Sequence, residues 1–486
     1  GTVTQNHAPR LRRVSPSPRK SESCIRTCCP VFPHNQPGQQ HAERINRIIG
    51  RIKNHPPIAG VDATDHNTMH PGIWLAFGNI SDNVANAQTP GYARRSTRIE
   101  DGTVIRYADE WRNNESRIAS GLAAQASTRL NWLESAERAL DDGETGIGQR
   151  VGAVFNRAEE LAADPNSVAR RSAYLQSIDD AAISFRTTAS GLKSSSEGIA
   201  SQAQQTVTSA NSDLKGLLNV NQTLLATPQG TSGYASLLDQ RDRLLTNLSR
   251  AVPVDVSLDF RGVATVRMSG TGVTLLNPDA AGAMGVTSAA NGTLTFSATQ
   301  PDGTASDVIP PGGSLAGMSS AAADIAEQRA SVDALAAKFA DLINSNQAAG
   351  RTKSGNPGGP LLEMGADGAL TIAALDVSVD ALATSNGTAD NANLLALNAA
   401  RRDSGIETAW TAIVSSHAQK VQSAKLVQES SQSRSEAADE ARDQLSGVDL
   451  DREAVELLRL QQSYEAAARV IQVAREMLQS INDIGG

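Results

Sequence analysis

Hydrophobic residues recur at every third or fourth position over most of this chain, which is the spacing of one face of an α-helix. The first such run comprises Ile118, Leu122, Ala126, Leu130, Leu133, Ala136 and Leu140. A second run from Ile147 to Leu161 should end at Asp164-Pro165, because proline disfavours helix in the residue before it. Ser167 is placed to cap a third run that continues to Leu224. The third helix would be far longer than a compact domain requires.

The hydrophobic period changes from 3.6 to 2 at about residue 252. Val254, Val256 and Leu258 alternate with polar residues, and turns are expected at Asn291-Gly292 and Asp302-Gly303. This pattern predicts a small antiparallel β domain over 252–316. It follows a helix at about 233–250 and precedes a helix at 319–347, short strands near 370–372 and 377–379, and helical segments at about 391–445 and 450–484.

The last helix has the most regular pattern in the chain. Its apolar positions follow 3-4 spacing with one gap, at Glu453, and define what we call the seam of this helix: Leu450, Leu457, Leu460, Tyr464, Ala467, Ile471, Ala474, Leu478 and Ile481. Such spacing over four heptads indicates a coiled-coil interface that needs a partner helix. The alternative is a terminal helix that packs only on its own domain.

The predicted fold is mainly α with an inserted small β domain, an elongated multi-domain arrangement of a long helical bundle and terminal coiled-coil helices. We expect a terminal coiled-coil domain from 73–105 and 447–486, and a helical body with short strands from 106–251 and 317–446. The β domain of 252–316 would interrupt that body. Residues 1–72 differ in composition and are expected to be a disordered or foreign leader.

Composition separates that leader from the rest of the chain. Of 486 residues, 40% are hydrophobic and only 3% aromatic, so the core must rely on aliphatic side chains and alanine. Residues 1–72 carry 10 Lys and Arg against 4 Asp and Glu, whereas the whole chain has a net charge of −8. The acidic remainder argues against a nucleic-acid binder. No stretch is long and apolar enough for membrane insertion, and none resembles a secretory signal.

Candidate catalytic and metal-binding groups are scarce. The three cysteines and six of the seven histidines lie within residues 1–70, and the spacing of Cys24, Cys28 and Cys29 fits no standard zinc site. His417 is then the one histidine available for a catalytic triad, and we interpret it as a solvated helix residue. The glycines at 146–152 lack dinucleotide-binding spacing. We therefore predict no catalytic residue, no metal and no cofactor.

Two segments at opposite ends of the chain resemble one protein family. Residues 79–94, NISDNVANAQTPGYAR, are similar to the N-terminal signature of bacterial flagellar rod, hook and hook-associated proteins, and 448–478 resemble their C-terminal helix. Between them, 234–248 and 339–347 are similar to segments typical of the hook-associated protein 1 family. The residues that carry the N-terminal motif are Asn83, Ala85, Asn86, Thr89, Pro90, Gly91 and Tyr92.

The resemblance implies a structural subunit at the junction between hook and filament, which acts by self-assembly. Its implied partners are other copies of itself, the hook protein, a second junction protein and a cytoplasmic export chaperone that binds the C-terminal helix. Location on the extracellular flagellum, after export through the flagellar type III apparatus, is implied as well. A hook-type or rod-type axial protein is the alternative within this class. A cytoplasmic coiled-coil scaffold or an adhesin-like binder that uses the β domain is the alternative outside it.

Overall fold

The computed structural model describes residues 71–365, 372–386 and 390–484, so most of the expected leader, 1–72, lies outside the described residues. The first part of the chain contains α2 (Pro71–Ala85), β1 (Arg95–Arg98), β2 (Thr103–Arg106), α3 (Glu110–Ala139), α4 (Ile147–Ala163), α5 (Val168–Ala226) and α6 (Ser232–Ala251). The strands β3 (Val254–Leu258), β4 (Ala264–Met268), β5 (Thr274–Leu276), β6 (Ala283–Ser288), β7 (Leu294–Thr299) and β8 (Ala305–Val308) follow. The last part contains α7 (Gly313–Ala349), β9 (Leu362–Met364), β10 (Ile372–Ala374), a 3₁₀ turn η2 (Val379–Ala381), α8 (Ala392–Ser404), α9 (Ile406–Ser446) and α10 (Leu450–Ile484).

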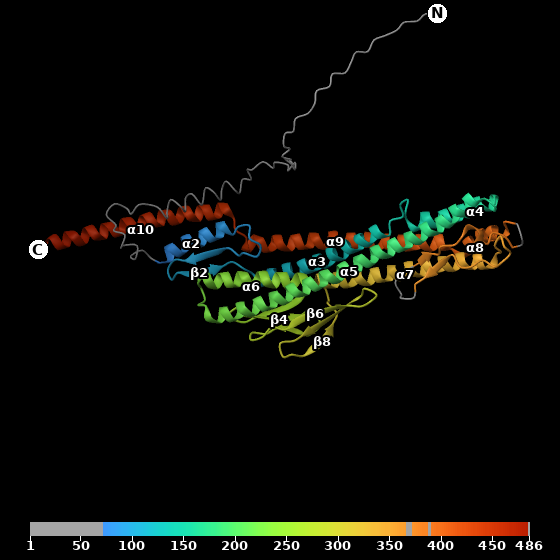
Figure 1. The fold of residues 1–486 in the computed structure, drawn as a ribbon. Helices are drawn as coiled ribbons and strands as arrows, with labels where there is room; N and C mark the ends of the chain where they lie inside the picture. The colour runs from blue at the N-terminus through green and yellow to red at the C-terminus, as the bar shows by residue number, and fades with distance from the viewer. Residues whose placement is uncertain (1–70, 366–371, 387–389, 485–486) are drawn as a thin grey trace, which may run out of the picture.

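The molecule is elongated, with long helices side by side along its length (Figure 1). The longest, α5, has 59 residues and therefore extends about 90 Å. Ser167 caps it as predicted, since its side chain accepts a hydrogen bond from the backbone N–H of Arg170. α2 and α10 lie at one end of the molecule, α4 and α8 at the other, and the strands β3–β8 project from one side (Figure 1).

The core of the body follows the apolar stripe that the sequence predicted along α5. The residues of that stripe buried in the structure are Ile178, Ala182, Phe185, Leu192, Ile199, Ala203, Val207, Ala210, Leu214, Leu217 and Leu224. Ala189 is half-buried. The rings of Phe185 on α5 and Phe339 on α7 lie 5.7 Å apart, which joins the two helices through one of the few aromatic contacts in the body. Most of the remaining contacts are made by Leu, Val, Ile and Ala.

The β region consists of two separate three-stranded antiparallel sheets, β3-β4-β5 and β6-β7-β8. Two asparagines of α5 attach them to the helical body through paired hydrogen bonds to strand backbone. Asn221 bonds the N–H and C=O of Ala264 at 2.9 and 2.8 Å. Asn211 does the same for Met284 at 2.8 and 2.9 Å. The sheets are therefore anchored to the long helix by side-chain amides as well as by apolar packing.

Three expectations about the helical body were wrong, two of them in α3 and near 377–379 and the third at His417. Ile118 and Leu122 are 48% and 44% exposed, because α3 presents Gly121 to α6, where an added Cβ would lie 2.7 Å from the carbonyl of Ser249. Close backbone approach selects the small residue for the inner face and leaves the larger ones outside. The strand expected at 377–379 is instead extended chain followed by η2. β10 pairs with β9, which the pattern did not indicate.

His417 is the third error, because it is buried rather than solvated. It is 1% exposed, and its Nε2 lies 2.9 Å from the carbonyl oxygen of Leu133 on α3. The buried face of α9 repeats every seven residues through Trp410, His417, Ala424 and Ser431. Because this face continues after Trp410 with small and polar side chains, the hydrophobic pattern of the sequence does not reveal it.

Candidate functional site

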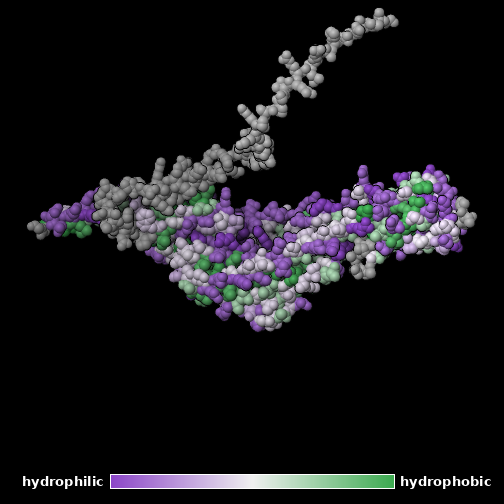
Figure 2. Space-filling model, in the orientation of Figure 1, coloured by the Kyte–Doolittle hydropathy of each residue, from purple (hydrophilic) through white to green (hydrophobic). Residues whose placement is uncertain are grey.

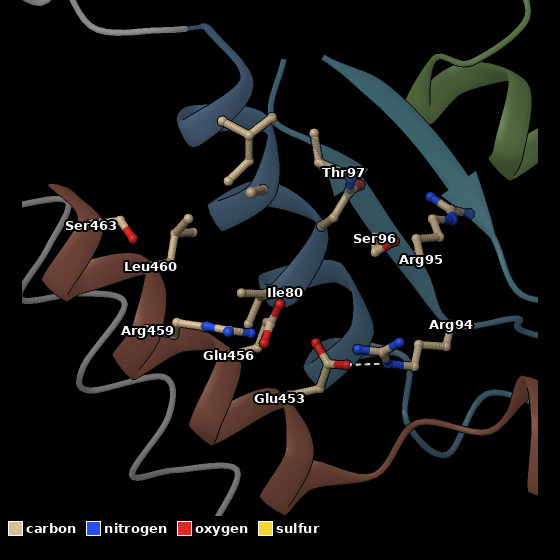
Figure 3. Close-up of a pocket in the computed structure, with 13 residues that line it drawn as sticks. Ile80, Arg94, Arg95, Ser96, Thr97, Glu453, Glu456, Arg459, Leu460 and Ser463 are labelled. Carbon is tan, nitrogen blue, oxygen red and sulfur yellow. Dashed lines mark hydrogen bonds and ion pairs between the residues drawn. The ribbon is translucent and has the colours of Figure 1, made fainter. Parts of the chain in front are cut away.

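The two ends of the described chain meet in an antiparallel helix pair, α2 with α10. Trp74 near the start of α2 contacts Tyr464, with ring centroids 6.2 Å apart, while Asn83 near its end contacts Glu453. The reversed order of these contacts defines the antiparallel orientation. Between them lies an apolar cluster formed by Ile73, Ala76, Phe77, Ile80 and Val84 of α2 with Leu457 and Leu460 of α10. Figure 3 shows Ile80 and Leu460 facing each other across this contact.

Asn83 is completely buried and uses all of its hydrogen-bonding capacity. Its amide nitrogen donates to the carbonyl oxygen of Arg95 at 2.8 Å and to the carboxylate of Glu453 at 2.9 Å. Its amide oxygen accepts from the N–H of Arg95 and the hydroxyl of Tyr92, each at 2.9 Å. Burial raises the pKa of Tyr92 well above its usual range, which keeps this hydroxyl protonated and able to donate. One motif residue thus connects α2, the chain after the motif turn, and α10.

Glu453 carries a buried charge within the α2–α10 contact. Glu453 is 0% exposed. The carboxylate oxygen that does not bond Asn83 accepts a hydrogen bond from Nε of Arg94 at 2.6 Å (Figure 3). The guanidinium of Arg94 lies 5.0 Å from the ring centroid of Tyr107. The backbone N–H of Arg94 donates to the carbonyl oxygen of Ser446 at 2.8 Å. A buried ion pair is tolerated when its remaining polar atoms are satisfied. Here Asn83 and Arg94 together satisfy the carboxylate.

A second group of ion pairs connects β1 and β2 with α6. Asp239, 2% exposed, pairs with Arg95 and accepts from Nε of Arg106 at 2.7 Å. Asp242 accepts from Arg106 and from Arg241, both at 2.7 Å. Burial would raise the pKa of Asp242, but Arg241 and Arg106 outweigh it and hold that pKa below its usual range. Arginines and carboxylates alternate through this group, so each buried charge lies beside a charge of opposite sign.

The motif turn follows the end of α2. Asn86 accepts from the backbone N–H of Thr89 at 2.9 Å, and Thr89 accepts from the N–H of Tyr92 at 3.1 Å. Pro90 is exposed, and Gly91 has φ of +76°, a conformation that favours glycine. A Cβ at Gly91 would also lie 2.8 Å from Cγ of Arg243. The turn therefore redirects the chain from α2 into β1. Ala85, the last residue of α2, is exposed.

The structure divides the seam of α10 into two halves. Leu457 and Leu460 are buried against α2, and Leu450 and Tyr464 pack on the same cluster. Ala467 and Ile471 are half-buried, while Ala474 is exposed, as are Leu478 at 66% and Ile481 at 67%. α2 thus contacts the first half of the seam, and the second half extends beyond it.

α10 also exposes apolar side chains that the seam does not include. Val470, Val473, Met477 and Ile484 are between 49% and 84% exposed. At 100° per residue these positions lie on the face opposite Leu457. Figure 2 shows a small hydrophobic patch near the free end of α10. By the same rotation Ile481 of the seam lies only about 20° from Val470, so the exposed apolar side chains near the end of α10 form one broad surface.

The sequence identified Asn83 and Tyr92 as motif residues, but it did not indicate the charged residues that surround them in the structure. Glu453 had a signal, since it is the one gap in the 3-4 spacing of the seam. No sequence pattern indicated Arg95, Asp239 or Asp242, because their partners come from distant segments of the chain.

Within 71–365, 372–386 and 390–484, we find no cluster of three or more metal-binding side chains and no helix suited to cross a membrane. A pocket of about 240 Å³ lies between α2, β1 and α10 (Figure 3).

Comparison with known proteins agrees with this arrangement. Residues 133–362 match the family described as "Flagellar hook-associated protein FlgK helical domain", and 443–484 match "Flagellar basal body rod FlgEFG protein C-terminal". Flagellar hook-associated protein 1 of Salmonella typhimurium is 25% identical over 316 residues, which cover 60% of this chain and 57% of that protein. The protein of the same name from Bacillus subtilis is 24% identical, with 84% of this chain and 95% of that protein covered.

The chain spans little more than half the length of the Salmonella relative. The solved structure of the flagellar hook junction protein FlgK from Burkholderia pseudomallei aligns over 52% of this chain and 47% of its own, with 23% identity and a TM-score of 0.46. The matched helical body and C-terminal segment define an axial structural protein of the bacterial flagellum. Within that class, the helical body matches the FlgK helical-domain family, and the chain is similar to hook-associated protein 1 of Salmonella and of Bacillus.

Proposed function

We propose that this chain is a structural subunit at the junction between the flagellar hook and filament, and that it acts by packing rather than by catalysis. The observation that carries the proposal is the α2–α10 pair, in which the family motif and the C-terminal helix lock together through Asn83 and Glu453. A pair of helices built in this way is a rigid unit that can pack against copies of itself. The matches to the helical domain and to the C-terminal segment support this assignment.

The domain arrangement supports the same role. We propose that 73–105 and 447–486 form the packing domain, that 106–251 and 317–446 form a spacer, and that 252–316 form a lateral domain. The hook protein and a second junction protein would contact the two ends of the assembled ring. The similarity of 443–484 to rod proteins makes a rod-type subunit the second candidate, and the helical-domain match at 133–362 favours the junction.

The exposed half of the seam offers a site for a chaperone before assembly. Leu478 and Ile481 are exposed here, and a cytoplasmic chaperone that covered them would prevent premature association during type III export. We propose that the chain then reaches the extracellular flagellum, where neighbouring subunits cover the same residues.

Deletion of 448–486 tests this function in a flagellated species whose own copy of the gene has been removed and replaced. We expect hooks without attached filaments in electron micrographs and loss of swimming, because the deletion removes α10. The full-length chain is the control. The shortened protein should keep its helical signal in circular dichroism, since the main core lies outside α10. Filaments that attach normally would contradict the proposal, and retention of the full-length chain inside filament-bearing cells would favour a cytoplasmic scaffold.

A further inference from the structure

Glu453 occupies a position in α10 where the coiled-coil pattern requires an apolar residue. The seam runs Leu450, then position 453, then Leu457 and Leu460, with spacings of three and four residues. The side chain of Glu453 is buried among the apolar residues that join α2 to α10. Burial of a carboxylate is unfavourable unless its charge and its oxygen atoms are matched. Glu453 therefore makes the pairing of α10 favourable only with a partner that supplies hydrogen-bond donors and a positive charge to the carboxylate.

The observed pairing supplies both partners from fixed positions. Asn83 is held by the backbone of Arg95 and the hydroxyl of Tyr92, so its amide nitrogen points at the carboxylate. Arg94 is held by its own backbone bond to Ser446 and by the ring of Tyr107. Neither group can follow α10 if the helix slides. A shift of one heptad would move the carboxylate by about 10 Å and leave it buried without a partner.

The competing association is a pair of α10 helices from two copies of the chain. Such a pair is otherwise favourable, because the seam continues through the exposed Leu478 and Ile481. In a parallel pair in register, the two Glu453 carboxylates would face each other. In an antiparallel pair centred on 450–481, Glu453 would face Leu478. Neither arrangement presents the fixed, buried amide and guanidinium that Asn83 and Arg94 supply. The nearest guanidiniums would be those of Arg452 in the parallel pair and Arg475 in the antiparallel pair, which flank the seam, so the carboxylate is matched less well than it is against α2.

We propose that Glu453 selects the partner and the register of α10: it accepts α2 with its motif turn and penalises a second α10. A buried polar residue in a coiled-coil interface acts in this way when a wrong partner leaves it unsatisfied. This inference rests on the proposed function in one respect, namely that self-assembly brings other copies of the chain close to α10. In that setting the selection keeps each C-terminal helix on its own N-terminal segment before the subunits pack.

Self-association of the purified full chain tests partner selection. In sedimentation equilibrium we expect E453L to associate with a dissociation constant at least tenfold below that of the unmodified chain. E465L is the matched control, since it makes the same replacement at an exposed position outside the seam and should stay within twofold. Because E453L leaves Arg94 buried and unpaired, E453L/R94M serves as a second variant that removes both charges. Dissociation constants for both variants within twofold of the unmodified chain would overturn the proposal.

Register is tested by thiol cross-linking in a chain whose Cys24, Cys28 and Cys29 are replaced by serine. Phe77 and Leu460 lie in the same apolar cluster, so F77C/L460C should cross-link with a short bifunctional reagent. F77C/A467C, one heptad away, should not. Adding E453L/R94M should make the shifted pair react. If the shifted pair stays unreactive, register is set elsewhere and the proposal is wrong. These experiments use purified protein and are independent of filament attachment. A negative result here would overturn the role of Glu453 even if attachment depends on 448–486, and normal attachment without 448–486 would overturn the proposed function even if Glu453 selects the partner of α10.

Discussion

The amide of Asn83 donates a hydrogen bond of 2.9 Å to the carboxylate of Glu453, although 370 positions separate them in the chain. Both residues are fully buried, and each is bonded to further residues of the motif region. The two ends of the protein are therefore joined by a specific polar contact inside an apolar helix pair. That contact makes the terminal segments a single unit, and its strength can be measured.

Replacement of Asn83 by alanine should destabilise the terminal pair by about 3 kcal/mol, because Glu453, Tyr92 and the backbone of Arg95 all lose a buried partner. The expected readout is faster proteolysis of α10 with an unchanged body, followed by mass spectrometry of the fragments. Asn86→Ala is the control, since the side-chain bonds of Asn86 are confined to Asp82 and Thr89 nearby. Equal protease resistance of N83A and the unmodified chain would contradict this account.

Gly91→Ala should destabilise the protein through two effects, a left-handed φ of +76° and a contact of 2.8 Å between the new Cβ and Cγ of Arg243. Gly270 has φ of +70°, and a Cβ added there would meet nothing within 4 Å, so Gly270→Ala carries the first effect alone. We expect about 1 kcal/mol for G270A and about 2 kcal/mol for G91A from chemical denaturation. Identical losses would show that Arg243 moves aside freely.

Asp242 should make the contact between β2 and α6 sensitive to acid. Its pKa is lowered in the folded protein, so its contribution to stability is present above the unfolded-state pKa of about 3.9 and is lost as pH falls through the lower folded value. Urea denaturation at several pH values below about 5 should therefore show a shallower decline in the free energy of unfolding for D242N than for the unmodified chain. E440Q, an exposed change on α9, is the control and should keep the original slope.

His417→Ala should lower the free energy of unfolding by about 2 kcal/mol, because it removes a buried side chain and its hydrogen bond to Leu133. Thermal denaturation followed by circular dichroism measures the loss. Ser416→Ala, at the exposed neighbouring position, should change the midpoint little. If both variants melt alike, the contact between α3 and α9 at His417 contributes nothing to stability.

The apolar periodicity of the chain was sufficient to locate the long helices and the buried stripe of α5, because both depend on a repeat within one segment. It failed where the inner face is not hydrophobic. Gly121 and His417 are buried against other helices, whereas Ile118 and Leu122 are exposed. The hairpin of β1 and β2 was missed as well, since its strands are short and its side chains are largely arginine, serine and threonine.

By itself, the sequence determined where the helices lie, which stripe of each is apolar, and that a motif near one end and a seam at the other resemble flagellar axial proteins. Those features are local, because side chains three or four residues apart share a helix face. Only the tertiary structure decided that α2 covers the first half of the seam and that Glu453 is matched by Asn83 and Arg94. Such matching depends on groups brought together from opposite ends of the chain, and no local repeat encodes it.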